Sequence, residues 1–484
     1  MKLAKLALIL GMTALLVACG DDEPSGDDDN AEPESEVNSN DEQSPDDNDS
    51  ANNDSVNNDT SNNDSANNDT SNNDSVNNDE PTGYDGPTYH DDIQPMMEAN
   101  CVGCHVPDSI APFALQTYEQ VKETALASHL TMVEGTMPPW PPADDCGEFQ
   151  GHRGVTAEEV DLFKEWIDEG YVEGEADDST DGQPDSGLTT LDDEPDLTVD
   201  WGFDYTPSPP GDDGIDDYRC FVIEPDIDED KFVNLVHTRP GNAEIVHHMI
   251  AYMAPASQSD HIDSLLAEDD RPGYECFGGP GFSDAEMLTG WAPGALPMPY
   301  EDGHGVRIAE DSQIIVQMHY NTVNDPDGSD RTEFDLFFVD EEEYPDPTEL
   351  VIVPLGAYDL FVEAGDSEGE AYAEGPTIPL DITLHGIAPH MHLLGTDIYV
   401  DADTGNGEMC LIDVPDWDFD WQGFYLYEEP IELASPVTTH LTCGFDNSAS
   451  NQPPGRTPED VYWGDGTYDE MCLVYFIIDR PPGM

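Results

Sequence analysis

The stretch IVHHMIAYMA, residues 245–254, is an apolar run typical of β-strands, and it contains two adjacent histidines. Neighbouring side chains on a regular strand point to opposite faces of the sheet, so His247 and His248 cannot both enter one apolar core. Taken alone, this pair also fits two hydrogen-bonded strand histidines. The run therefore predicts a strand, and the rest of the sequence must decide what its histidines do.

The region around this stretch, residues 201–484, is β-like throughout. Short runs rich in Val, Ile, Phe and Tyr alternate with Pro, Gly and Asp, and no long amphipathic helix intervenes. The clearest runs are KFVNLVHTRP, SQIIVQMHYNT, EFDLFFVD, ELVIVPLG, DITLHGIAP and DEMCLVYFIID. About 285 residues of this kind suggest two sandwiches rather than one. We therefore expect two all-β antiparallel sandwich domains, at residues 201–345 and 346–484.

The first 19 residues have the pattern of an export signal. Lys2 and Lys5 precede an apolar segment, residues 6–17, that is too short to be a good membrane span. LVAC at residues 16–19 resembles a bacterial lipobox, in which the cysteine is lipidated; an ordinary signal peptide that contains a cysteine is the alternative. We expect an extracytoplasmic chain anchored to the cell envelope through lipid on Cys19 alone. Gly20, in place of the aspartate associated with inner-membrane retention, favours the outer membrane.

Acidic residues dominate the rest of the chain. Residues 20–85 hold 22 acidic and no basic side chains, with six copies of Asn-Asn-Asp at a period of five. Such a segment has little to bury and repels itself, so it predicts a disordered tether. A calcium-binding repeat would need glycine turns and apolar positions that are missing here. Residues 86–484 carry 86 acidic and 11 basic side chains. This charge disfavours nucleic acid and anionic membrane surfaces as partners, and favours neutral or cationic small molecules.

CVGCH, residues 101–105, has the form of a c-type haem attachment site. Cys101 and Cys104 would bind the haem vinyl groups, and His105 would be an axial ligand. The alternative, a zinc site, would need a second pair of ligands nearby, and none has suitable spacing. Met137 in GTMPPWPP is the best candidate for the sixth ligand, with Met132 as the second choice.

A closing helix is predicted at TAEEVDLFKEWIDEG, residues 156–170, where Thr156 and Glu159 form a capping box. Residues 86–175 therefore resemble a small all-α cytochrome c domain, and residues 176–200 form an acidic linker. Once Cys19, Cys101 and Cys104 are assigned, an even number of cysteines remains for disulfides in an oxidising compartment. These are Cys146, Cys220, Cys276, Cys410, Cys443 and Cys472. Spacing alone does not choose among their 15 pairings.

Three further sites join the paired histidines. His319 ends an apolar strand in QMHYN, His390 and His392 are spaced i, i+2 in HMHLLG, and Met471 lies in EMC. Side chains two apart on a strand share a face, so His390 and His392 can bind one ion. Imidazole suits copper and zinc, whereas a thioether favours Cu(I), so this set indicates copper.

In these motifs the sequence resembles the copper type II, ascorbate-dependent monooxygenases, which include peptidylglycine α-hydroxylating monooxygenase and dopamine β-monooxygenase. The resemblance covers residues 200–484 and rests on four motifs in the family's order: HHM at 247–249, QMHYN at 317–321, HMHLLG at 390–395 and EMC at 470–472. It implies two jelly-roll-like sandwiches that face each other across a cleft. It also implies an electron-transfer copper at His247, His248 and His319, and an oxygen-binding copper at His390, His392 and Met471.

The resemblance further implies hydroxylation of a substrate C–H bond with O₂. Tyr475 matches a substrate-side tyrosine, but Ala388 replaces the arginine that clamps the substrate carboxylate in peptide-amidating members, and Leu473 replaces a polar neighbour. Peptide amidation is therefore disfavoured. By resemblance we also expect a disulfide between Cys443 and Cys472.

Cys220 and Cys276 are plausible disulfide partners in the first sandwich. Electrons would come from ascorbate or a redox protein, relayed through the fused haem. A haem and copper electron-transfer or copper-binding lipoprotein without hydroxylase activity is the alternative function. An adhesive pair of sandwiches with incidental histidines is a third.

Overall fold

The computed structural model describes residue 84 and residues 86–106, 111, 113–143, 145–176, 194–210 and 214–482. The export signal with Cys19, nearly all of the tether and most of the acidic linker lie outside the described residues, so the predictions for these segments stay predictions.

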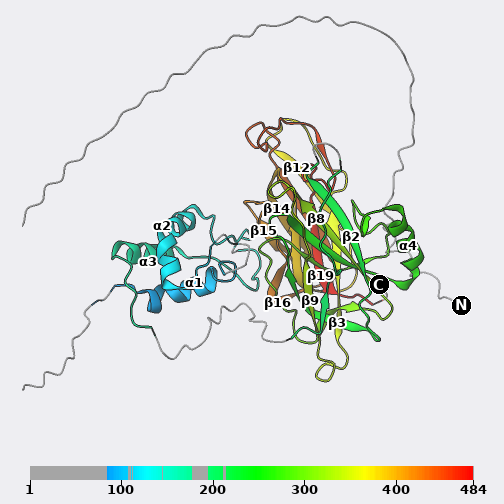
Figure 1. The fold of residues 1–484 in the computed structure, drawn as a ribbon, viewed down its shortest axis with the longest axis horizontal. Coiled ribbons are helices and arrows are strands. Elements are labelled where there is room, and N and C mark those ends of the chain that lie inside the picture. Colours follow the sequence, from blue (N-terminus) through cyan, green and yellow to red (C-terminus); the bar gives the residue numbers. More distant parts are fainter. Residues whose placement is uncertain are drawn as a thin grey trace, which may run out of the picture. The chain divides into compact units, whose positions relative to one another are not determined.

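A small helical region follows the tether (Figure 1). It contains a π-helical turn, η1 (Tyr89–Ile93), and the helices α1 (Gln94–Asn100), α2 (Tyr118–Glu134) and α3 (Ala157–Asp168). Its core is formed mainly by Tyr89, Ile93, Met97, Val121, Phe163 and Trp166. The predicted capping box at the start of α3 is confirmed: the Thr156 hydroxyl accepts the Glu159 N–H, and the Glu159 carboxylate accepts the Thr156 N–H. The described helices fit the expected all-α class, and their assignment as a cytochrome c domain stays a prediction.

The remainder of the described chain is built mainly from β-strands, as predicted. Their bounds are β1 (Leu197–Val199), β2 (Asp216–Ile223), β3 (Lys231–Arg239), β4 (Val246–Ala254), β5 (Tyr274–Glu275), β6 (Glu286–Trp291), β7 (His304–Ile308), β8 (Gln313–Asn321), β9 (Glu333–Phe338), β10 (Thr348–Gly356), β11 (Phe361–Val362), β12 (Gly369–Glu374), β13 (Ile382–His390), β14 (Gly395–Thr404), β15 (Gly407–Val414), β16 (Tyr425–Leu433), β17 (Thr438–Phe445), β18 (Val461–Tyr462) and β19 (Leu473–Asp479). One short helical segment interrupts them, η2 (Ala256–Gln258) followed by α4 (Ser259–Glu268).

The two expected halves share one sheet. Its order is β1-β9-β3-β7-β10-β19-β13-β16, so strands from residues 201–345 and from 346–484 are continuous in it. The junction is the parallel pairing of β7 with β10, where His304 lies opposite Thr348. A five-stranded sheet, β5-β2-β8-β4-β6, and a four-stranded sheet, β12-β17-β14-β15, complete the sandwiches, and β11 pairs with β18. The jelly-roll description of the two halves stays a prediction.

Strand β10 contributes to both hydrophobic cores. Leu350 and Ile352 belong to the core that also holds β4 and β8, whereas Val351 belongs to the core of the second half. Successive side chains of a strand point to opposite faces, so the two cores lie on opposite faces of the shared sheet at β10. Strand β8, in the middle of the five-stranded sheet, is buried along its whole length except at Asn321.

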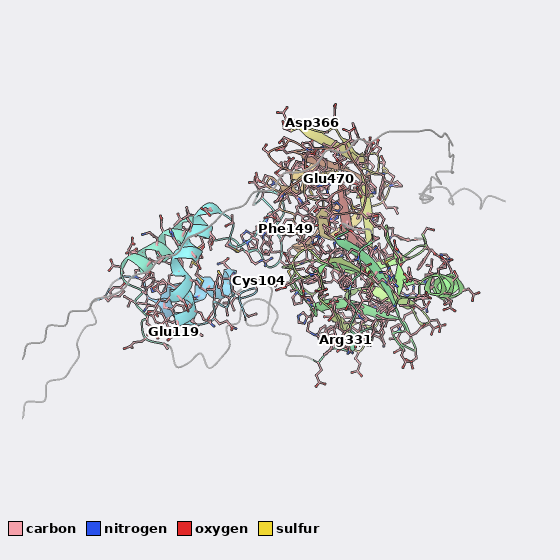
Figure 2. All side chains as sticks on the ribbon, turned by 45° about the horizontal axis from the view of Figure 1, so that its top comes forward. Cys104, Glu119, Phe149, Arg331, Asp366 and Glu470 are labelled. Atoms are coloured by element: carbon pink, nitrogen blue, oxygen red, sulfur yellow. A yellow bond between two sulfur atoms is a disulfide. The ribbon has the colours of Figure 1, made fainter. Side chains whose placement is uncertain are left out.

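Residues 137–153, which we call the arm, connect α2 to α3 and also bind the β-region. Cys146 forms a disulfide with Cys410 of β15. Phe149, which is labelled in Figure 2, belongs to the core of the second half and packs against Tyr427 of β16. The Gln150 N–H donates to the Leu426 carbonyl at 2.8 Å. The arm is therefore held to the second half by a covalent bond and by packing.

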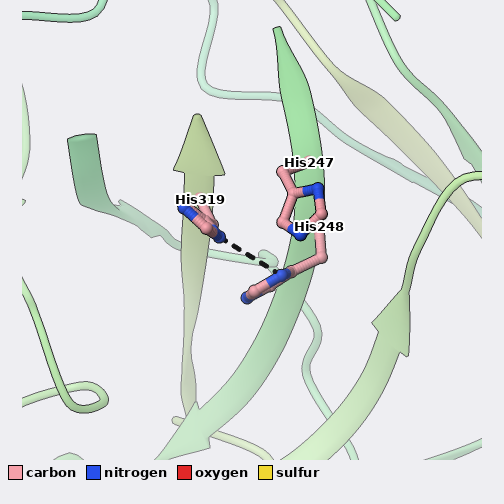
Figure 3. Close-up of side chains that lie close together, drawn as sticks. All are labelled: His247, His248 and His319. Atoms are coloured by element: carbon pink, nitrogen blue, oxygen red, sulfur yellow. Dashed lines mark hydrogen bonds between the residues drawn. The ribbon is translucent and has the colours of Figure 1, made fainter. Parts of the chain in front are cut away.

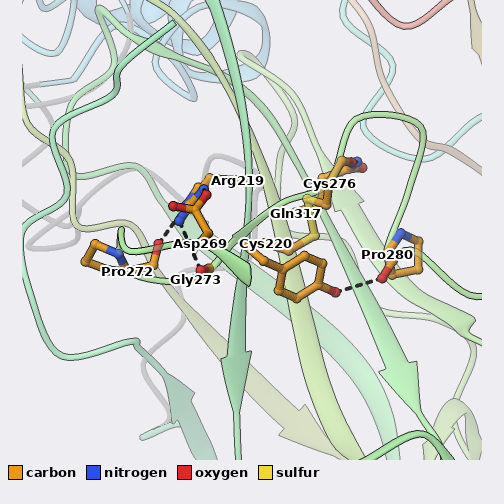
Figure 4. Close-up of a disulfide and its surroundings, with 9 residues drawn as sticks. Arg219, Cys220, Asp269, Pro272, Gly273, Cys276, Pro280 and Gln317 are labelled. Carbon is orange, nitrogen blue, oxygen red and sulfur yellow. Dashed lines mark hydrogen bonds and ion pairs between the residues drawn. A yellow bond between two sulfur atoms is a disulfide. The ribbon is translucent and has the colours of Figure 1, made fainter. Parts of the chain in front are cut away.

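Two further disulfides lie within the halves. Cys220 pairs with Cys276, and Cys443 pairs with Cys472, which are the pairs considered from the resemblance. Beside the first, Arg219 is buried against Asp269 and the carbonyls of Pro272 and Gly273 (Figure 4). Three disulfides in the described chain indicate an oxidising, extracytoplasmic environment. Among the described helices, none combines the length and the apolar character that a membrane span requires.

Replacing Cys146 and Cys410 together with Ser should loosen the arm. The bridge closes a loop across a sequence separation of 264 residues, and loss of such a bridge lowers the free energy of unfolding by about 2–4 kcal/mol. Urea unfolding measures this change, and limited proteolysis should then cut first within the arm. Equal unfolding curves and equal cleavage for the variant and the wild type would show that packing around Phe149 alone holds the arm.

Candidate metal centre

A β-bulge brings the adjacent histidines together. In the pairing of β4 with β8, Val246 lies opposite Tyr320 and His248 opposite His319, so His247 is one extra residue on β4. A bulge breaks the alternation of a strand and redirects a side chain. As a result His247, His248 and His319 each offer a ring nitrogen, and these three atoms lie within 4.8 Å of one another (Figure 3). The structure therefore gathers the three histidines proposed for one copper.

The His319 ring is held by its surroundings. Its Nε2 donates to the Asp216 carboxylate at 2.9 Å, and its Nδ1 lies 3.4 Å from Nδ1 of His248. The Thr467 hydroxyl donates to the same carboxylate at 2.8 Å, and the Tyr218 ring stacks on His319 with 4.1 Å between centroids. A donor bond from one imidazole nitrogen to a carboxylate fixes the tautomer and leaves a lone pair on the other nitrogen, as in many metal sites. Nδ1 of His319 is thus the nitrogen available to an ion.

His390 and His392 are held in a similar way. Nδ1 of His390 donates to Oε1 of Gln422 at 2.5 Å, and the Gln422 amide nitrogen donates to the Phe419 carbonyl, which sets its orientation. Nδ1 of His392 donates to the Asp469 carbonyl at 3.0 Å. Both rings therefore keep Nε2 as the lone-pair nitrogen.

Glu470 fixes the backbone around these ligands. Its carboxyl group is fully buried and accepts N–H groups from His392 at 3.0 Å, Leu394 at 2.6 Å and Met471 at 3.3 Å. One side chain thus positions the second histidine and the methionine together. Burial, which outweighs these three hydrogen bonds, raises the pKa of Glu470 to about 8.

The two histidine sets adjoin. The ring centroids of His248 and His390 are 6.2 Å apart, and those of His390 and His392 are 5.1 Å apart. Burial, and then the neighbouring imidazoles, lower the pKa of His247 to about 4 and of His392 to about 3. The pKa values of the other three rings are lowered by burial as well. All five imidazoles are neutral at pH 7, the form that binds a transition metal, so the residues present fit such ions.

A cavity of about 460 Å³ opens beside the histidines. His248, His390, His392 and Met471 line it. The remainder of its wall is largely aromatic and apolar, and includes Tyr218, Tyr252, Tyr358, Trp291, Trp463, Phe424, Leu473 and Tyr475. Tyr475 on β19 lies directly opposite Ala388 on β13. The predicted substrate-side tyrosine and the alanine at the expected clamp position therefore share this wall. Asp465 is the one carboxylate that lines this cavity among the described residues.

The predicted haem ligands follow α1. Cys101 and Cys104 are partly buried and, unlike the other described cysteines, are unpaired. Nδ1 of His105 donates to the Phe113 carbonyl at 2.9 Å, which leaves Nε2 for an iron ligand. Two free thiols and one oriented imidazole fit a c-type haem. Of the sixth-ligand candidates, Met132 packs in the helical core and Met137 is half-buried at the start of the arm.

Sequence reasoning did not identify Asp216 and Gln422, which orient two of the histidines from 103 and 32 residues away. No local pattern marks either residue. Glu470 could have been recognised from the sequence. It directly precedes the candidate ligand Met471 and an apolar strand, and an acidic residue that is buried at such a place needs hydrogen-bond partners. His385, five residues before His390, lies next to His304 and Asp479 and is not part of the candidate copper centre.

Comparisons with known proteins add no functional information. The sequence matches no protein-family model and no curated protein. A structure of Sulfolobus turreted icosahedral virus is 7% identical with a TM-score of 0.28, covering 59% of this chain and 90% of that one. A Paenibacillus xanthan lyase is 10% identical with a TM-score of 0.15, covering 59% and 25%. The infectious bursal disease virus VP2 subviral particle is 11% identical with a TM-score of 0.15, covering 59% and 71%.

The buried Glu470 should make the stability of the metal-free chain depend on pH. Its folded pKa of about 8 lies above the ordinary value of 4.5, so its stabilising contribution is present at low pH and is lost as the pH rises through 8. Relative to Glu470→Gln, the free energy of unfolding of the wild type should fall between pH 5 and pH 8, by at most about 1.4 kcal/mol per pH unit. Urea unfolding across this range tests it, and parallel curves would contradict it.

Proposed function

We propose that this chain is a copper-dependent monooxygenase of the copper type II class, which hydroxylates a C–H bond of a small organic molecule with O₂. The observation that carries the proposal is the bulge at His247, which gathers three neutral imidazoles beside a second pair, His390 and His392. Met471 lines the cavity that both sets reach. The regular pairing of β4 with β8 is interrupted at His247, and packing of the sheet alone gives no reason for this interruption.

The residues at the centre fall into ligands of the two coppers and residues that position those ligands. His247, His248 and His319 would hold one copper, and His390, His392 and Met471 the other. When bound, copper supplies one-electron chemistry with O₂. Asp216 and Gln422 keep the imidazole lone pairs directed, and Glu470 fixes the backbone of His392 and Met471. The aromatic and apolar wall of the cavity would pack against a bound substrate.

The cavity supports a neutral or cationic substrate. Its described lining contains the Asp465 carboxylate and no Arg or Lys, and Ala388 offers nothing to bind a carboxylate. Tyr and Trp faces attract cations as well as apolar rings. A small aromatic molecule, with or without an ammonium group, matches these walls better than an anion does.

The arm supports an electron supply through the fused haem. Nη1 of Arg153 lies 3.5 Å from Sγ of Cys104, and Trp140 packs edge-on against Tyr425 of β16. Trp140 and Arg153 also line a small pocket together with Gln422, the partner of His390. One segment thus contacts both the predicted haem site and the surroundings of a copper ligand. The electron donor to the haem would be ascorbate or a redox protein, and lipid on Cys19 would hold the chain at the outer membrane.

Metal content is the decisive measurement. Protein matured in a periplasm competent for c-type haem should contain two coppers and one haem per chain. Met471→Ala should abolish O₂-dependent hydroxylation in a substrate screen while the haem spectrum stays unchanged, because the thioether belongs to the oxygen-side set alone. Met409→Ala, at an exposed methionine of β15, is the matched control.

A chain with one haem that takes up no copper on reconstitution would be a tethered cytochrome with a silent β-region. Copper without turnover would support the electron-transfer alternative.

Asp465 should make the binding of cations depend on pH. Burial, with a smaller contribution from Asp469, raises the pKa of Asp465 to about 6, so its negative charge develops as the pH rises through that value. Benzylamine should therefore bind up to about tenfold more tightly at pH 7 than at pH 5, whereas benzyl alcohol should show no such change. Calorimetry on wild type and Asp465→Asn measures this. A pH dependence that persists in the variant would assign it to another group.

A further inference from the structure

A second histidine cluster lies away from the candidate copper centre. His304 begins β7, His385 lies in β13 and Asp479 ends β19, and one ligand atom from each lies within 4.8 Å of the others. His385 is five residues from His390 along the same strand, which corresponds to roughly 16 Å. The two clusters therefore cannot share an ion.

The hydrogen bonds of this cluster leave lone pairs unused. Nδ1 of His304 donates to the Asp302 carbonyl at 3.1 Å, so Nε2 carries the lone pair. Nε2 of His385 donates to the Asp479 carboxylate at 2.8 Å, and its Nδ1 is buried without a hydrogen-bond partner. The His385 side chain is only 3% exposed, so this atom is shielded from bulk solvent. A buried acceptor of this kind is unfavourable unless a proton or a cation meets it.

Local charge also favours a cation. His385 lines a cavity of about 270 Å³ whose other described lining residues include Glu301, Asp302, Glu428 and Glu429, with no Arg or Lys among them. Arg480, beside Asp479 in sequence, pairs with Glu286 and Glu349 instead. The carboxylate of Asp479 is thus not neutralised by its neighbour.

His385 is placed by a β-bulge. In the pairing of β13 with β19, Leu384 lies opposite Ile478 and Gly386 opposite Ile477, which leaves His385 as the extra residue. Its ring centroid then lies 5.0 Å from that of His304, although β7 and β13 are not neighbours in the shared sheet. A bulge that redirects a histidine toward other metal-binding side chains is the same device that builds the candidate copper centre.

We infer that His304, His385 and Asp479 form a separate site for a divalent cation of the zinc type. Nε2 of His304 and Nδ1 of His385 would be its ligands, and water from the adjoining cavity would complete the set. Asp479 would hold the Nε2–H of His385, as a carboxylate does at many histidine–zinc sites, so that Nδ1 stays directed at the ion. The ion would connect β7 of the first half with β13 of the second. This inference is independent of the proposed hydroxylase activity.

Zinc uptake by the full mature chain tests the inference. Equilibrium dialysis against micromolar Zn²⁺ at high salt should show one equivalent fewer bound in His304→Ala, His385→Gln and Asp479→Asn than in the wild type. The copper content of the reconstituted variants should not change. His440→Ala is the matched control, because His440 forms a similar pair with Asp401 (2.8 Å) near the surface and should lose no zinc.

Equal zinc content in wild type and the three variants would overturn the inference. A loss of zinc in His440→Ala as well would also overturn it, because binding would then reflect scattered histidine–carboxylate pairs on an acidic surface. His304 is half-buried at the start of β7, so His304→Gln keeps the test decisive if the change at buried His385 prevents folding.

Discussion

The alternation of side chains along a β-strand is the constraint on which this structure depends, and the candidate centre exists where that alternation fails. On a regular β4, His247 and His248 would lie on opposite faces of the five-stranded sheet. The extra residue opposite Tyr320 and His319 lets both converge on one side. The surrounding residues complete the arrangement: His319 lies opposite His248 on the neighbouring strand, and the Phe419 ring stacks on His247. A deletion of one residue here would turn a metal-binding set into an ordinary strand.

The same alternation of side chains explains how the two halves share one sheet and how one strand, β10, contributes to both cores. Strand β10 presents Leu350 and Ile352 to one core and Val351 to the other, so each core depends on a strand that also serves its neighbour. The six candidate ligands come from β4, from β8, from the last residue of β13 and the loop after it, and from the segment just before β19. Strands β4 and β8 belong to the five-stranded sheet, whereas β13 and β19 belong to the shared sheet. The close approach of the ligands, with 6.2 Å between the ring centroids of His248 and His390, therefore depends on how these two sheets pack.

Local features of this fold could be predicted from the sequence, whereas distant pairings could not. The capping box at Thr156 and the all-β character of residues 201–484 follow from neighbours in the chain. His390 and His392 do lie together, but β13 ends at His390, so strand alternation alone does not place them. The parallel pairing of β7 with β10 and the bridge from Cys146 to Cys410 join segments with no common pattern. The residues that hydrogen-bond to the candidate ligands could not be predicted from the sequence either. Asp216 on β2 binds His319 on the neighbouring strand β8, and nothing in the sequence distinguishes it from the other acidic residues of a chain that has 108 of them.

The bridge between the arm and β15 also sets an order of events during maturation. Cys146 leaves the ribosome long before Cys410, which follows 264 residues later, so the arm stays untethered while most of the β-region is still being made and exported. During that interval the thiols of Cys101, Cys104 and Cys146 coexist in an oxidising compartment, within 45 residues of each other. A premature bond between Cys146 and either of the other two would consume a thiol of the predicted haem site together with the anchor of the arm. The distance in sequence between Cys146 and its partner thus makes the order in which these thiols react decisive for correct folding of this chain.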